Sequence, residues 1–137
     1  MEKVRKTILL ADDEPEILKS IGEILERFGY NVIARPDGHA ALSVIREGTP
    51  IDLVLVDYVM PGMDGLELLK SLKELAPDVP LVLFTGNSTI EAYLKALGLG
   101  VHEYVNKPVT AQKLKKIVRA AIEKGQADAP SSASQEC

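Results

Sequence analysis

One short segment, residues 51–65, constrains the fold of this chain more than any other. Its run from Leu53 to Val56 is entirely aliphatic, and it ends on Asp57 shortly before a Pro-Gly pair. Four to eight aliphatic residues bounded by turn signals are typical of a strand that is buried on both faces of a parallel sheet. A carboxylate directly after such a strand costs desolvation free energy. Asp57 is therefore either a turn residue, as Asp is in many loops, or a functional group.

Segments with strand and helix patterns alternate along the chain. Short apolar runs bounded by turn residues predict strands at Lys6–Ala11, Tyr30–Ala34, Leu53–Val56, Leu81–Phe84 and Val101–Val105. Each run is followed by a segment with apolar residues at helical spacing, such as Ile17, Ile21 and Leu25 after the first run. Five strands that alternate with five helices predict a single-domain (βα)5 α/β fold, a doubly wound parallel sheet with helices on both faces and right-handed crossovers.

Local signals mark where the first helices begin. Asp13 and Glu16 have the spacing of a capping box, and Pro15 suits a first helical turn. Asp37 and Gly38 open the second helix. One interpretation of Asp13 is therefore that it is only the N-cap of the first helix.

Composition and charge narrow the class of protein. The chain has 137 residues, of which 46% are hydrophobic and 26% charged, and this is typical of one globular domain. A net charge of −4 without a basic run argues against direct nucleic-acid binding. The sequence contains neither an apolar stretch of membrane-spanning length nor a signal-peptide core. Because Cys137 is the sole cysteine, an intrachain disulfide is excluded, and we expect a reducing, cytoplasmic setting.

The two ends of the chain differ in pattern. We expect residues 1–125 to form the domain, because the periodic segments lie there. Residues 126–137 lack periodicity and are almost free of large apolar residues, so we expect a disordered tail or the start of a linker. A stand-alone regulator and a domain taken from a longer protein both fit this pattern.

Reactive or polar side chains follow four of the five predicted strands. They are Asp12 and Asp13 after the first, Asp57 after the third, Thr85 after the fourth, and Tyr104 with Lys107 at the end of the fifth. Ligands of open α/β sheets bind beyond this edge. Each residue has a simple structural interpretation, such as a turn for Thr85 or an edge-strand aromatic for Tyr104. A lysine just before a helix opposes the helix dipole, however, so Lys107 indicates a negative partner.

The chemistry of this group of residues points to phosphoryl transfer. Clustered carboxylates repel one another, and a hard divalent cation such as Mg²⁺ relieves that repulsion. An Asp beside the metal can attack phosphorus and become an aspartyl phosphate. Lys107 can then neutralise the phosphoryl oxygens, and the Thr85 hydroxyl can donate a hydrogen bond to one of them.

From about Thr7 to Lys124 the sequence resembles the receiver domain of bacterial two-component response regulators. The resemblance rests on four spaced motifs, namely Asp12-Asp13, Asp57-Tyr-Val-Met-Pro-Gly-Met-Asp-Gly65, Thr85 and Lys107-Pro108. It implies a flavodoxin-like fold with strand order 2-1-3-4-5. It also implies a phosphorylation-dependent signalling switch that is not an enzyme in its own right and assists only its own phosphorylation and dephosphorylation.

The resemblance further implies roles for particular residues. Asp57 would be the phosphoacceptor. Mg²⁺, with Mn²⁺ as an alternative, would be bound by Asp13, Asp57 and the backbone carbonyl of Val59, with Asp12 acting largely through water. Lys107 and Pro108 would be joined by a cis peptide that turns the lysine toward the phosphate. Lys107 would bind the phosphoryl group together with Thr85.

We also expect a signalling output and partners. A phosphoryl group on Asp57 should draw Thr85 inward and free space for the Tyr104 ring, which would alter the surface of the fourth helix, fifth strand and fifth helix. The donor would be a histidine kinase or a histidine phosphotransfer protein. A downstream protein or a second copy of the chain would bind the altered surface.

The lifetime of the phosphorylated state depends on whether a water can attack in line with phosphorus. The side chains best placed to hold or exclude that water are Val59 and Asn87, and neither supplies a carboxylate base. We therefore expect slow loss of the phosphoryl group.

Other classes of protein fit less well. A small-molecule phosphatase would normally have a second carboxylate where Val59 stands. A degenerate binding module would not keep all the reactive residues, and a flavin carrier would need a hydroxyl- and Gly-rich loop after the first strand.

Overall fold

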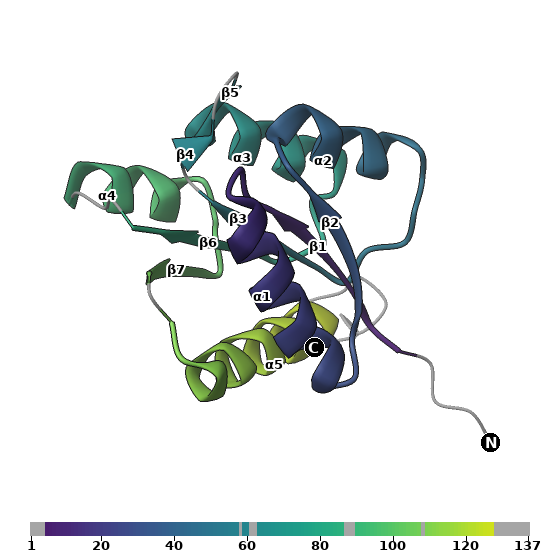
Figure 1. Cartoon of the computed structure of the whole chain (residues 1–137). Coiled ribbons are helices and arrows are strands. Elements are labelled where there is room, and N and C mark those ends of the chain that lie inside the picture. The colour runs from purple at the N-terminus through teal and green to yellow at the C-terminus, as the bar shows by residue number, and fades with distance from the viewer. Residues whose placement is uncertain (1–4, 58, 61–62, 87–89, 108, 128–137) are drawn as a thin grey trace.

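The computed structural model describes residues 5–57, 59–60, 63–86, 90–107 and 109–127 (Figure 1). The strands of the main sheet are β1 (Thr7–Ala11), β2 (Asn31–Arg35), β3 (Leu53–Asp57), β6 (Leu81–Thr85) and β7 (Glu103–Asn106). The helices are α1 (Pro15–Arg27), α2 (Gly38–Arg46), α3 (Gly65–Leu75), α4 (Ile90–Gly98) and α5 (Ala111–Ala127). Two further short strands, β4 (Val59–Met60) and β5 (Met63–Asp64), pair antiparallel and were not predicted.

The main sheet is parallel throughout, with strand order β2-β1-β3-β6-β7. This is the predicted order 2-1-3-4-5, so the predicted fold is confirmed. Ala11 pairs with Val56 in the register of β1 and β3, and Asp57 pairs with Phe84 in the register of β3 and β6. The residues that follow β1, β3 and β6 therefore meet at one edge of the sheet.

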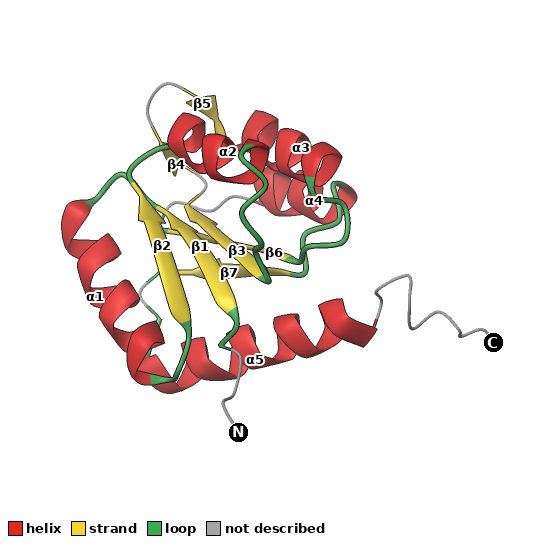
Figure 2. Ribbon diagram, turned by 90° about the vertical axis from the view of Figure 1, so that its right-hand side faces the viewer, coloured by secondary structure: helices red, strands yellow, loops and turns green. Residues whose placement is uncertain are grey.

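Two layers of helices cover the sheet, α1 and α5 on one face and α2, α3 and α4 on the other (Figure 2). Successive strand residues point to opposite faces. Thus Val54 and Val56 belong to the core under α2, α3 and α4, whereas Leu53 and Leu55 belong to the core under α1 and α5. Since both faces of β3 are buried, the strand is aliphatic at every position up to Asp57. Within the described residues, no helix is long and apolar enough to cross a membrane.

Several predicted strand boundaries differ from the structure by one or two residues. The last strand begins at Glu103 and not at Val101, because the preceding residues form the turn out of α4. There Gly100 has a φ of 88°, and the amides of Val101 and His102 donate to the carbonyls of Ala96 and Leu81. Helix α5 continues to Ala127, and the expected end of the domain at residue 125 stays a prediction. The predicted tail from residue 128 onward lies outside the described residues.

The start of α1 also differs from the prediction. Pro15 occupies the first turn, as expected, but the N-cap is Glu14 and not Asp13. The Glu14 side chain makes no capping hydrogen bond, and the Glu14 amide donates to Asp12 Oδ1 at 2.9 Å. The predicted capping box of Asp13 and Glu16 is therefore wrong. Asp13 is left available for a role at the edge of the sheet.

Candidate functional site

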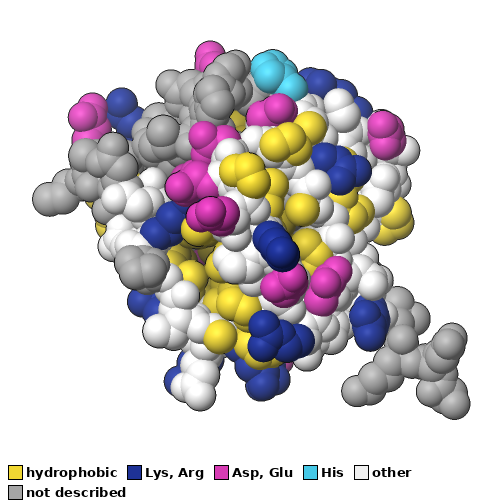
Figure 3. Space-filling view, viewed as in Figure 1, with side chains coloured by type: hydrophobic (Ala, Val, Ile, Leu, Met, Phe, Trp, Pro, Cys, Tyr) yellow, Lys and Arg dark blue, Asp and Glu magenta, His cyan; other side chains and the backbone are white. Residues whose placement is uncertain are grey.

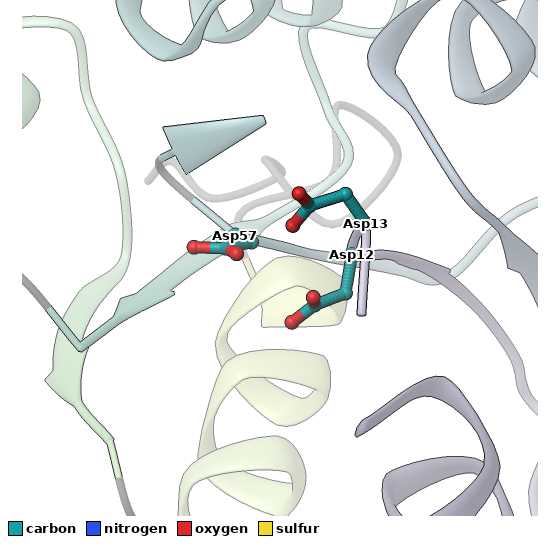
Figure 4. A group of neighbouring side chains, drawn as sticks. All are labelled: Asp12, Asp13 and Asp57. Atoms are coloured by element: carbon teal, nitrogen blue, oxygen red, sulfur yellow. The ribbon is translucent and has the colours of Figure 1, made fainter. Parts of the chain in front are cut away.

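Three carboxylates meet beyond the carboxyl ends of the two central strands. Asp12 and Asp13 follow β1, and Asp57 is the last residue of β3 (Figure 4). One oxygen from each lies within 4.8 Å of the others. Asp12 and Asp57 are buried, with exposed fractions of 0% and 4%, whereas Asp13 is exposed. Asp12 and Asp57 are therefore shielded from bulk water, whereas Asp13 is in contact with it.

Lys107 lies among these carboxylates. Its Nζ is 2.9 Å from Asp12 Oδ2, 3.3 Å from Asp57 Oδ2 and 3.3 Å from Glu14 Oε1. The backbone positions it, since the Lys107 amide donates to the Thr85 carbonyl at 2.8 Å just after β6 and β7 end. The negative partner that the sequence indicated for this lysine is thus present.

The carboxylates also fix the charge of Lys107. Burial alone lowers the pKa of the ammonium, because it disfavours the charged form. The hydrogen bond to Asp12 and the charges of Asp57 and Asp12 outweigh burial, so the pKa of Lys107 is raised above its ordinary value of 10.5. Lys107 is therefore an ammonium at neutral pH and offsets part of the clustered negative charge.

Thr85 and Tyr104 lie on β6 and β7, to one side of β3, and are not members of the carboxylate cluster. Thr85 ends β6, is 1% exposed, and follows Phe84, the residue paired with Asp57. Tyr104 is half-buried on β7 and packs on the side of the sheet that α4 covers. The rings of Tyr104 and Tyr93 of α4 meet edge to face, with their centroids 5.4 Å apart. The Tyr104 ring thus connects β7 to α4.

The donor set fits a hard divalent cation. Carboxylate oxygens are the ligands that Mg²⁺ prefers, and one or two of them usually bind it directly. Both oxygens of Asp12 already accept hydrogen bonds, one from the Glu14 amide and one from Lys107. This is compatible with contact between Asp12 and a metal through water, while Asp13 and Asp57 face the same space.

Some predicted site features lie outside the described residues. Pro108 and Asn87 are among them, and so is the side chain of Val59, whose backbone belongs to β4. The cis peptide and the control of phosphoryl lifetime therefore stay predictions.

Sequence reasoning missed two contacts. Glu14 reaches Lys107 across 93 positions of sequence, and the Lys107 ammonium lies 5.0 Å from the centroid of the Phe84 ring. A signal for Glu14 was present, because it directly follows the acidic pair at a helix start, where Glu is not a favoured N-cap residue. No local pattern marks Phe84, an ordinary core residue of a strand.

A parallel sheet in this strand order, with three carboxylates and a lysine at its carboxyl edge, defines a receiver-type signalling domain. A family model described as the response regulator receiver domain matches residues 8–119, so the chain belongs to the response regulator receiver domain family. The family is one of signalling domains and not a catalytic family, and it serves phosphorylation-dependent two-component signalling.

Relatives of known class agree with this assignment. Response regulator GtcR of Aneurinibacillus migulanus is 38% identical over 75% of this chain and 42% of its own length. The phosphate regulon transcriptional regulatory protein PhoB of Pseudomonas aeruginosa is 33% identical over 93% of this chain and 57% of its own length. The chain thus spans about half the length of these relatives.

Solved structures agree as well. A response regulator receiver domain protein (CheY-like) from Methanospirillum hungatei JF-1 superposes with a TM-score of 0.88 at 30% identity, covering 92% of this chain and 100% of its own. A receiver domain protein from Clostridium thermocellum gives a TM-score of 0.83 at 32% identity, covering 88% of this chain and 97% of its own.

Proposed function

We propose that Asp57 is the phosphoacceptor of this receiver domain and takes its phosphoryl group from a histidine kinase or a histidine phosphotransfer protein. The observation that carries the proposal is the position of Asp57. Its carboxylate is buried at the end of β3, lies 3.3 Å from the Lys107 ammonium, and shares one space with Asp12 and Asp13. A buried carboxylate at such a site costs stability, and a chemical role explains why it is there.

In the proposed step, an Asp57 oxygen forms a bond to phosphorus while the bond from phosphorus to the donor imidazole nitrogen breaks. The nitrogen keeps the electron pair of that bond. Lys107 and the Thr85 hydroxyl would bind the phosphoryl oxygens. Asp13, Asp57 and the Val59 carbonyl would hold Mg²⁺ or Mn²⁺, with Asp12 acting through water, and the metal would neutralise charge that develops on the transferred group.

Labelling with a small acyl phosphate in the presence of Mg²⁺ tests the acceptor. Intact mass analysis should show one added phosphoryl group on the wild type and none on Asp57→Asn, because the amide cannot replace the nucleophile. Asp52→Asn is the matched control, since Asp52 is a half-buried aspartate at the opposite end of the same strand region. Labelling of Asp57→Asn at the wild-type level would refute the assignment.

We further propose that phosphorylation draws Thr85 inward and lets the Tyr104 ring move with it. The contact between Tyr104 and Tyr93 supports this, because it connects β7 to α4. The face made by α4, β7 and α5 would be the output surface, and exposed Leu94 and Leu97 on α4 suit a protein partner or a second copy of the chain. We place this signalling in the cytoplasm and expect no direct nucleic-acid contact by this domain.

Chemical shifts recorded with beryllofluoride, a phosphoryl mimic, test the switch. Resonances of Tyr104 and α4 should shift in the wild type, because the ligand stabilises one of two states of the domain. The shifts should shrink at least several-fold in Thr85→Ala and persist in Thr85→Ser, which keeps the hydroxyl. Shifts confined to the carboxylates in the wild type would contradict the switch.

A further inference from the structure

Glu14 lies at the start of α1, and its side chain makes no capping hydrogen bond. It is the N-cap of α1, but Ser, Thr, Asp and Asn are the residues that cap well, and the Glu14 carboxylate caps nothing. The backbone of Glu14 instead carries the helix start, since its carbonyl accepts from the amides of Ile17 and Leu18. The side chain is free to serve another purpose, and it extends to Lys107, 3.3 Å away.

Lys107 divides its ammonium among three carboxylates with different surroundings. Among the described residues, the side chains within ion-pair distance are those of Asp12, Asp57 and Glu14. Asp12 and Asp57 are buried and belong to the metal-binding cluster, whereas the Glu14 side chain is 61% exposed and lies outside that cluster. Acidic side chains gather on this face near the first turn of α1 (Figure 3). Glu14 is therefore the most solvated and most easily exchanged partner of Lys107.

We propose that Glu14 is a positioning residue that retains Lys107 in the unphosphorylated protein and competes with the phosphoryl group for it. The inference rests on the proposed phosphorylation of Asp57. An ammonium has three donors, and all three have carboxylate partners here. A phosphoryl group adds strong acceptor oxygens beside Lys107, and the lysine meets them by releasing the partner that is best hydrated on its own.

This competition sets how tightly the site takes up a phosphoryl group. Because an exposed ion pair contributes little, its loss should strengthen binding of a phosphoryl mimic by about two- to five-fold. The effect should be specific to the mimic, since Glu14 is not among the carboxylates grouped for a metal.

Three variants distinguish the effect of the Glu14–Lys107 contact from the effect of a negative charge near the site. Glu14→Gln removes the charge of the competitor. Glu14→Asp keeps the charge but shortens the side chain, and Asp at an N-cap is drawn toward the helix amides and away from Lys107. Glu16→Gln is the matched control, because Glu16 is an exposed acid in the same first turn that lies outside the ion-pair group of Lys107.

The measurement is the affinity for beryllofluoride at saturating Mg²⁺, with the Mg²⁺ affinity measured separately and the Lys107 Nζ resonance followed in the free protein. Both Glu14 variants should bind beryllofluoride about two- to five-fold more tightly and shift the Nζ resonance, whereas Glu16→Gln should do neither. Equal tightening by both Gln variants, or wild-type behaviour of Glu14→Asp, would mean that charge alone acts and would overturn the inference. Wild-type affinity in every variant would overturn it too. Failure of the wild type to bind the mimic while it binds Mg²⁺ would instead refute the proposed phosphorylation, and the inference with it.

Discussion

At the amino end of the central sheet, the loop before β3 is hydrogen-bonded to β1 and α5 approaches Pro80 closely, whereas at the carboxyl end polar groups are buried together. At the amino end, Asp52 Oδ2 accepts the Thr7 amide at 2.8 Å, and the Asp52 amide donates to the Thr7 carbonyl at the same distance. Gly125 of α5 lies so near Pro80 that an added Cβ would be 2.8 Å from the ring. These contacts join the loop before β3 to β1 and bring α5 against the loop before β6.

At the carboxyl end of the sheet, by contrast, polar and charged side chains are buried close to one another. Among the described residues, the buried polar or charged side chains are Asp12, Asp57 and Thr85, and all three lie there. Breaking a buried charged network is costly, yet forming one is often no better for stability than apolar packing. We infer that the two cores and the amino end stabilise the fold. At the carboxyl end, burying clustered charges lowers the unfolding free energy but creates a site for a ligand.

Adding or removing metal should reveal this contrast most strongly. At 100 times its dissociation constant, Mg²⁺ should raise the unfolding free energy of the wild type by about 2.7 kcal/mol, because it binds only the folded state. Asp13→Ala should lose most of that gain. Without metal, the same variant should be more stable than the wild type, because one of the repelling carboxylates is gone. Urea unfolding with and without Mg²⁺ measures both effects.

Asp78→Ala provides the control at the other end, since Asp78 is an exposed aspartate in the loop before β6. It should keep the full Mg²⁺ effect and change the metal-free stability by less than about 0.5 kcal/mol. Equal Mg²⁺ stabilisation of the wild type and Asp13→Ala would show that the carboxylate cluster does not bind the metal.

Patterns with a short period were enough to predict most of the fold. The aliphatic run of β3 and the apolar stripe of α1 follow from burial on two faces and on one, so the layers could be predicted from these patterns. The strand order came from the family resemblance. Asp57 and Lys107 were also found, because each breaks a local rule, a charge after a buried strand and a cation at a helix start.

The features that could not be predicted from the sequence depend on contacts between residues that are far apart in the chain. Asp13 was assigned as the N-cap because only the spacing to Glu16 was visible, whereas Asp12 accepts the Glu14 amide and the helix begins after Glu14. The contact between Glu14 and Lys107 exists only once β1 and β7 are placed in one sheet. Similarly, the first residues of the predicted last strand belong to a turn held by the Leu81 carbonyl of β6.

The smallest expected effect lies at the amino end and concerns the close approach of α5 to Pro80. Gly125→Ala gains up to about 1 kcal/mol of helix propensity, but its Cβ would lie 2.8 Å from Cδ and 3.0 Å from Cγ of a rigid ring, and overpacking typically costs about 1–3 kcal/mol. We expect a net loss of about 1 kcal/mol in urea unfolding.

Gly98→Ala at the end of α4 is the matched variant, because its Cβ would meet no atom within 4 Å. It should be neutral or more stable by up to about 1 kcal/mol. Neither variant should change the Mg²⁺ effect or the labelling of Asp57, since both sites lie away from the carboxylates. If Gly125→Ala stabilised the domain as much as Gly98→Ala, α5 would not be tightly packed against Pro80. The contrast between the two ends of the sheet would then rest on the carboxylates alone.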